Sequence, residues 1–130
     1  MSWIQILIWL NGAMFVGYGV ACLVSPALPA GYAGFELATT SGTVEIVAMY
    51  GGLQVGFGVL LLLGALKPEM RDTALWAMAV VLGSLCLARV FGLVFHGASA
   101  YNLAAAAYEG TVATLSILAL RTGAAREVTP

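Results

Sequence analysis

Residues 45–58, EIVAMYGGLQVGFG, decide how this chain folds. They place one acidic residue at the start of an apolar stretch whose next turns are largely glycine, alanine and one amide. Small side chains offer little surface to lipid but let a neighbouring helix come close, which suits the interior of a helical membrane protein. We therefore expect the rest of the chain to pack around this segment.

The composition indicates an integral membrane protein. Of the 130 residues, 62% are hydrophobic and 8% are charged, whereas an ordinary soluble domain has roughly 25% charged residues. Four apolar runs are each long enough, at about 1.5 Å per helical residue, to cross a hydrocarbon core of about 30 Å. Lipid cannot satisfy the polar groups of an open strand, so these runs are predicted to be helices.

The predicted fold is therefore all-α, a four-helix bundle that forms a single transmembrane domain over residues 1–130. A long outer connection is expected at 25–42 and a cytoplasmic tail at 122–130. The predicted helices cover residues 3–24, 43–66, 73–95 and 103–121.

Basic residues predict the orientation of the chain. Lys67 and Arg71 lie between the second and third helices, and Arg121 and Arg126 follow the fourth, while the other two connections have none. Cytoplasmic loops carry an excess of Lys and Arg. We therefore expect the protein to reside in the inner (cytoplasmic) membrane, with both termini on the cytoplasmic side.

The second helix has two faces that are poorly suited to lipid. On a regular helix Glu45, Gly52 and Gly56 share one face, and the spacing of the two glycines allows another backbone to approach closely. Gln54 points to the opposite side, with Tyr50 nearer to Gln54 than to Glu45. Either the bundle surrounds this helix or one face meets another protomer, and packing within the chain is the favoured interpretation.

Three ionisable residues from three helices fall in one predicted outer-leaflet layer. Arg89 and Glu109 each lie about 9 Å inside the outer ends of their helices, and Glu45 begins the second helix near the same boundary. Ionisable groups at such depth are costly unless they are paired or face a cavity. We expect Arg89 to lie between the two carboxylates.

The layer has two interpretations. In the structural one, Glu45 favours the positive end of its helix dipole, Arg89 reaches the head groups, and Glu109 is its one partner. In the other, the residual charge of −1 marks a ligand site or a protonatable carboxyl. The side chains that could complete such a site are Tyr18, Tyr50, Gln54, His96 and Asn102.

Other chemistries lack support in the sequence. Cys22 and Cys86 are predicted at different depths, so no disulfide is expected, and a metal site would need Glu45, Glu109 and His96 without any ligand-spacing motif. We predict no metal and no cofactor. The net charge of −1 leaves no basic surface for nucleic acid.

A longer motif surrounds the Tyr50-Gly51-Gly52 block. It reads Glu45-x-x-Ala48-x-Tyr50-Gly51-Gly52-Leu53-x-x-Gly56-x-Gly58, then Arg89-x-x-Gly92 with Gly97, then Glu109. From Pro26 onward the chain resembles a bacterial family known as domain of unknown function number forty-three forty-five. Its members are small four-helix membrane proteins broadly similar to the DoxX-like proteins.

The sequence departs from that family at two places. The family pattern has an arginine where Val47 stands and an acid where His96 stands, so the charge balance of the outer layer differs here. The resemblance implies no settled activity. Similarity to DoxX-like proteins implies only an association with quinone or redox systems in some relatives.

Three classes of function follow from these residues. The leading hypothesis is a membrane protein that binds a lipid-like or quinone-like amphiphile, or that serves as an accessory subunit of a membrane partner or homo-oligomer, through Glu45, Arg89 and Glu109. A proton-coupled transporter is the second, because membrane carboxylates carry protons in pumps and transporters. An enzyme acting on an isoprenoid or quinone head group is the third.

Overall fold

The computed structural model describes residues 1–122, and helices occupy nearly all of that range. No strand occurs in it, which confirms the predicted all-α class. The predicted tail, apart from Thr122, lies outside the described residues. The elements are α1 (Trp3–Val24), α2 (Leu28–Ala33), α3 (Thr40–Ile46), the π-helix η1 (Val47–Gly52), α4 (Leu53–Leu66), the 3₁₀-helix η2 (Pro68–Met70), α5 (Arg71–His96) and α6 (Ala100–Arg121).

Four helical segments are long and apolar enough to cross a membrane, so the chain is a multi-pass membrane protein. The second of them starts at Thr40, because η1 joins α3 and α4 without a break. The connection predicted at 25–42 contains α2, whose six residues cover about 9 Å and cannot cross a bilayer. The spans are Trp3–Val24, Thr40–Leu66, Pro68–His96 and Ala100–Arg121.

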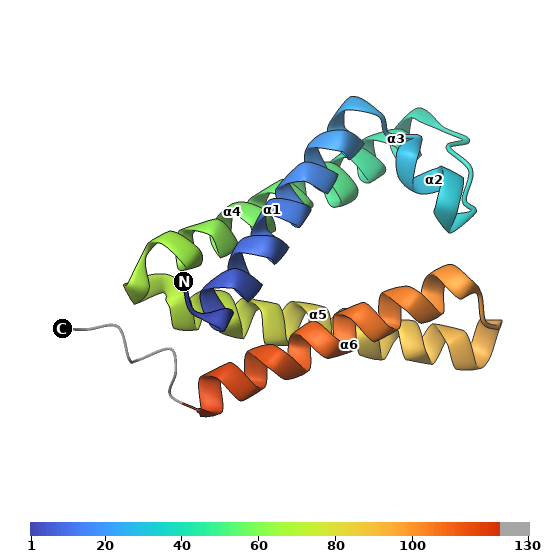
Figure 1. The fold of residues 1–130 in the computed structure, drawn as a ribbon. Coiled ribbons are helices and arrows are strands. Elements are labelled where there is room, and N and C mark those ends of the chain that lie inside the picture. The colour runs from blue at the N-terminus through green and yellow to red at the C-terminus, as the bar shows by residue number, and fades with distance from the viewer. Residues whose placement is uncertain (123–130) are drawn as a thin grey trace. The chain divides into compact units, whose positions relative to one another are not determined.

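The chain divides into two compact units, Met1–Leu66 and Lys67–Pro130. In the first, α1 and α4 run side by side, with η1 continuing the contact (Figure 1). In the second, α5 and α6 form a helical hairpin whose turn lies at residues 97–99.

Glycines bring the backbones of the first unit together. A Cβ atom on Gly19 would lie 2.8 Å from the Val55 nitrogen and 2.9 Å from the Gly51 oxygen. A Cβ atom on Gly58 would lie 2.7 Å from the Val16 nitrogen and 2.8 Å from the Gly12 oxygen. Side chains do not approach backbone this closely, so only glycine fits at these crossings.

The buried residues of α1 lie on the side that contacts α4 and η1. They recur at spacings of three and four residues, which places them on one side of the helix. Phe15 adds an edge-to-face contact with Phe57 at 4.9 Å between ring centroids. The buried residues of α1 are Ile4, Ile8, Asn11, Gly12, Phe15, Gly19 and Cys22.

Within the first unit, Gly52 and Gly56 make no close contact with α1, and their role in helix packing remains a prediction. Both are exposed, and among the described residues no atom would lie within 4 Å of a Cβ at either position. Gly51 and Gly58, which are seven residues or about two turns apart, face α1 instead. The π-helical turn η1 changes the direction of this face relative to Glu45, which precedes it.

Local signals fix where the helices of both units start and stop. Ser2, Thr39 and Ser99 each accept a hydrogen bond from a first-turn backbone N–H of the helix that follows. The end of α5 is set by Gly97, whose φ of +99° is a conformation that favours glycine. The tight turn from Gly97 to Ser99 then brings α6 back along α5.

Replacing Gly19 or Gly58 with Ala should lower the free energy of unfolding by about 1–3 kcal/mol, because the added methyl group meets backbone that cannot move aside. The measurement is equilibrium unfolding in mixed micelles, followed by circular dichroism. Gly56→Ala is the matched control in the same helix and should be neutral or stabilising by up to about 1 kcal/mol. Equal losses at Gly56 and Gly58 would contradict the observed contact.

Candidate functional site

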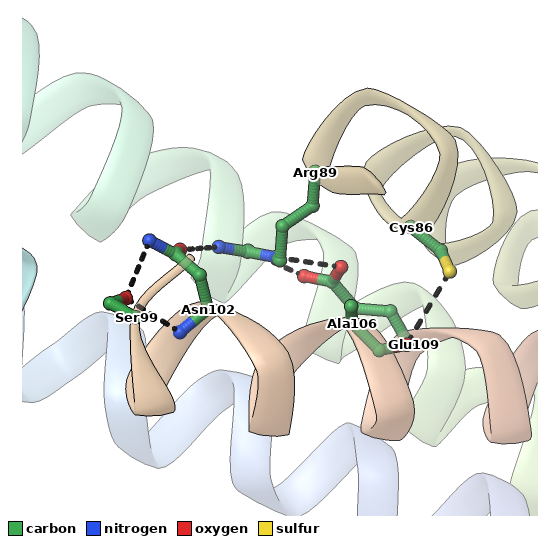
Figure 2. Close-up of polar contacts among 6 residues, drawn as sticks. All are labelled: Cys86, Arg89, Ser99, Asn102, Ala106 and Glu109. Atoms are coloured by element: carbon green, nitrogen blue, oxygen red, sulfur yellow. Dashed lines mark hydrogen bonds and ion pairs between the residues drawn. The ribbon is translucent and has the colours of Figure 1, made fainter. Parts of the chain in front are cut away.

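The centre of the second unit is a two-pronged ion pair between Arg89 of α5 and Glu109 of α6. The Nε atom of Arg89 donates to Oε2 of Glu109 at 3.0 Å, and its NH2 group donates to Oε1 at 2.6 Å. Both carboxylate oxygens thus accept from one guanidinium (Figure 2). This fork-on-fork geometry is the strongest and most directional form of such a pair.

A hydrogen-bonded chain extends from the pair to the start of α6. The NH1 group of Arg89 donates to Oδ1 of Asn102 at 2.7 Å. The Nδ2 group of Asn102 donates to the Ser99 hydroxyl oxygen at 3.0 Å, and that oxygen also accepts from the Asn102 backbone N–H. The residue that caps α6 therefore also orients the amide that holds Arg89 (Figure 2).

Two further contacts frame the guanidinium. The Arg89 Cζ atom lies 5.9 Å from the centroid of the Tyr101 ring, within the range of a cation–π interaction. One turn before Arg89, the Cys86 thiol donates to the Ala106 carbonyl at 3.4 Å. Asn102, Ala106 and Glu109 thus lie on one face of α6, at spacings of four and three residues.

The pair is largely shielded from solvent. The side chain of Glu109 is 7% exposed and that of Arg89 is 23% exposed. Breaking such a pair would leave one charge without its counter-charge in a low-dielectric setting, which costs several kcal/mol. The network therefore keeps Arg89 fixed and Glu109 occupied as an acceptor.

A shallow hollow borders this network on α6. Its volume is about 420 Å³, and it is an open depression lined by α6 alone. It shares two residues with the α5 contact, since Cys86 bonds the Ala106 carbonyl and a Cβ on Gly110 would lie 3.2 Å from the Cys86 sulfur. The lining residues are Ala106, Ala107, Gly110, Thr111, Thr114 and Leu115.

Glu45, the third member of the predicted layer, belongs to the first unit. Its side chain is exposed, and no described residue of that unit pairs with it. The structure brings Arg89 and Glu109 together within the second unit. A placement of Arg89 between both carboxylates remains a prediction.

Of the secondary candidates, Asn102 is the one that hydrogen-bonds Arg89 among the described residues. Tyr18 packs against Tyr32 of α2 at 6.5 Å between centroids, and Tyr50 of η1 packs against Phe35 at 6.1 Å. These contacts tie the connection between α1 and α3 to α1 and η1. The remaining two candidates are His96, the exposed last residue of α5, and Gln54, which is partly exposed on α4.

Sequence reasoning missed Ser99, Tyr101 and the π-helical turn. Ser99 had a readable signal, because a serine directly before an apolar run is a common helix N-cap. The pairing of Tyr101 with Arg89 depends on the turn between the helices and had no signal of its own. Among the described residues no group of three His, Cys, Asp or Glu side chains could hold a metal ion.

A family model described as "Domain of unknown function (DUF4345)" matches residues 3–120, which include almost all of the four membrane-capable helices. The chain belongs to this family. The Tyr50-Gly51-Gly52 block that carried the resemblance lies on η1, and Arg89 and Glu109 form the ion pair. Neither the curated proteins nor the solved structures include a match to the chain.

Glu109→Gln should lower the free energy of unfolding by up to about 3–5 kcal/mol, because it leaves the Arg89 guanidinium without a counter-charge. The double variant Arg89→Leu/Glu109→Leu should lose less stability than Arg89→Leu and Glu109→Leu lose together, since it removes both charges. The free energy of unfolding of each variant is measured in detergent. Glu45→Gln, at an exposed carboxylate, is the control and should stay within about 0.5 kcal/mol.

An Arg89→Leu variant that unfolds at the same denaturant concentration as the parent would rule out an energetic role for the pair. A double variant that lost as much stability as the two single variants together would rule out coupling between the two charges.

Proposed function

We propose that this protein binds a lipid-like amphiphile in a bacterial inner membrane, with a polar head at Arg89 and an apolar tail in the hollow on α6. The observation that carries the proposal is the shared border: Ala106 and Gly110 belong both to the hollow and to the contact with Cys86, one turn from Arg89. An amphiphile needs a polar group to bind its head and an adjoining apolar surface to bind its tail.

The head group that suits Arg89 is an acceptor such as a phosphate, a carboxylate or a quinone carbonyl. Guanidinium groups recognise oxygen acceptors directionally, and here Glu109 and Asn102 hold the group in one orientation. Such preorganisation lowers the cost of binding. The Ala, Gly and Thr residues of the hollow leave room for a chain that runs from the level of Arg89 toward the far end of α6.

The network supports binding more than proton chemistry. Both oxygens of Glu109 already accept hydrogen bonds from Arg89, so this carboxylate would have to break a close pair before it could take up a proton. A proton-coupled transporter or an enzyme that uses Glu109 as its acid would need that step in every cycle. An amphiphile-binding protein needs no such step.

Binding should depend on the hollow. Two probes suit the purified protein: a quinone with a ten-carbon tail and dodecyl phosphate, each titrated and followed by native mass spectrometry. Thr111→Leu narrows the hollow without touching the ion pair and should weaken binding by about tenfold, the loss expected from a direct steric conflict of roughly 1.4 kcal/mol. Ala104→Leu changes an exposed residue of α6 outside the hollow and should leave binding unchanged.

The head-group half of the proposal has its own test. Arg89→Lys keeps the charge but loses the planar fork, so binding of both probes should weaken while unfolding stability falls less than in Arg89→Leu. Equal binding by the parent, Thr111→Leu and Arg89→Lys would refute the site, as would a parent that binds neither probe.

A role as a subunit of a membrane complex is a second candidate, supported by the exposed stripe of Ala48, Gly52 and Gly56. Small residues four apart let helices associate closely in lipid. If this stripe binds a partner or a second copy, Gly52→Leu should abolish the oligomer seen in gentle detergent extracts. Gly17→Leu, at an exposed glycine of α1 with open space around it, is the control.

A further inference from the structure

A second arginine of α5 has a buried Nε atom without a hydrogen-bond partner among the described residues. Arg71, the first residue of α5, is 4% exposed, and its Nε atom has no hydrogen-bond acceptor in the structure over residues 1–122. Its neighbour Asp72 has the same problem with the opposite charge, since its Oδ1 atom is buried and has no donor within the same range. Buried polar groups without partners are rare in proteins and call for an explanation.

The two side chains cannot readily satisfy each other. Consecutive residues of a helix point about 100° apart, so Arg71 and Asp72 do not face one another along α5. Arg71 instead shares the buried face of α5 with Ala74, Leu75 and Met78, all of which are 0% exposed. A charged group on such a face needs an ionic partner from elsewhere.

The position of Arg71 along α5 corresponds to the head-group region of a membrane. Trp76, five residues further on, is 58% exposed, and exposed tryptophans favour the boundary between hydrocarbon and head groups. Arg71 precedes it by about 7.5 Å along the helix axis. The group that meets Arg71 and Asp72 is therefore expected to belong to the polar surface of the bilayer.

An anion here would be held by the guanidinium and not by the backbone. The 3₁₀-helix η2 runs directly into α5, so the Arg71 N–H already donates to the Pro68 carbonyl, and Asp72 is an acidic residue of the first turn. A guanidinium by itself suits a phosphate. Asp72 beside it would repel a simple anion, but its unpartnered oxygen suits a group that donates.

We propose that Arg71 and Asp72 bind a phosphoethanolamine head group, with the phosphate on Arg71 and the ammonium on Asp72. One ligand then satisfies two buried atoms of opposite character that the described chain leaves without partners. This site is independent of the proposed amphiphile site, because Arg71 and Arg89 are 18 residues apart in the sequence, about 27 Å along α5.

The test compares three lipids on the full-length, delipidated protein by native mass spectrometry: phosphatidylethanolamine, phosphatidylcholine and phosphatidylglycerol. The parent should favour phosphatidylethanolamine, since the choline head group has no N–H to donate to Asp72. Arg71→Gln should reduce bound phosphatidylethanolamine by roughly tenfold, as expected for the loss of a charged hydrogen bond. Lys67→Gln, at the exposed lysine of the same turn, should bind like the parent.

Asp72→Asn keeps Arg71, the proposed partner of the phosphate, and therefore tests the contact with the ammonium alone. It should retain binding of phosphatidylglycerol but lose the preference for phosphatidylethanolamine over phosphatidylcholine. Both variants are first checked by circular dichroism, and Arg71→Lys replaces Arg71→Gln in the comparison if the latter does not fold. Soluble phosphoethanolamine is added in competition: displacement of the lipid assigns recognition to the free head group, and no displacement assigns it to the whole lipid.

Two results would overturn the proposal. One is equal lipid binding by the parent, Arg71→Gln and Asp72→Asn. The other is a parent that binds phosphatidylethanolamine and phosphatidylcholine equally, because Asp72 would then make no contact with the ammonium. Neither result bears on binding at Arg89, so a failure here and a failure of the amphiphile site are distinguishable.

Discussion

A charge inside a bilayer must have a partner, and the second unit of this protein is organised by that requirement. Arg89 and Glu109 come from different helices, and their two-pronged contact is possible only at one relative position of α5 and α6. The Cys86 contact with the Ala106 carbonyl and the Asn102 contact with Arg89 occur at that same register. One ion pair therefore fixes how a hairpin of two long helices is aligned.

The first unit reaches a stable contact by another route. Its hydrogen bonds across the helices are few, and its main contact is the close approach of backbones at Gly19 and Gly58. In lipid, apolar side chains gain little from leaving one apolar environment for another, so tight packing has to supply the association. Glycine achieves this because van der Waals attraction falls steeply with distance.

The contrast explains which features could be predicted from the sequence. Segment length and hydropathy are sufficient for the four helices, and depth alone indicates that Arg89 needs a carboxylate such as Glu109, because an unpaired charge there is too costly. The contact of α1 with Gly51 and Gly58 could not be predicted, since Gly52 and Gly56 on the same helix are also spaced for close approach and the sequence does not say which side meets the neighbour. Tertiary contacts of Glu45 have no such constraint, because its side chain is exposed on α3 and can remain without a partner in the first unit.

The two arginines of α5 differ in whether the described chain supplies their partners. Arg89 is partly exposed and has partners within its own unit, so its pair both holds the hairpin together and gives the guanidinium one orientation. Arg71 is more deeply buried and its Nε atom has no acceptor in the described chain, so the fold alone does not account for its charge. The two arginines therefore lead to different conclusions, although they lie on the same helix. A satisfied charge explains the packing around it, whereas an unsatisfied one implies a group that residues 1–122 do not supply, and its position on the helix restricts the chemistry of that group.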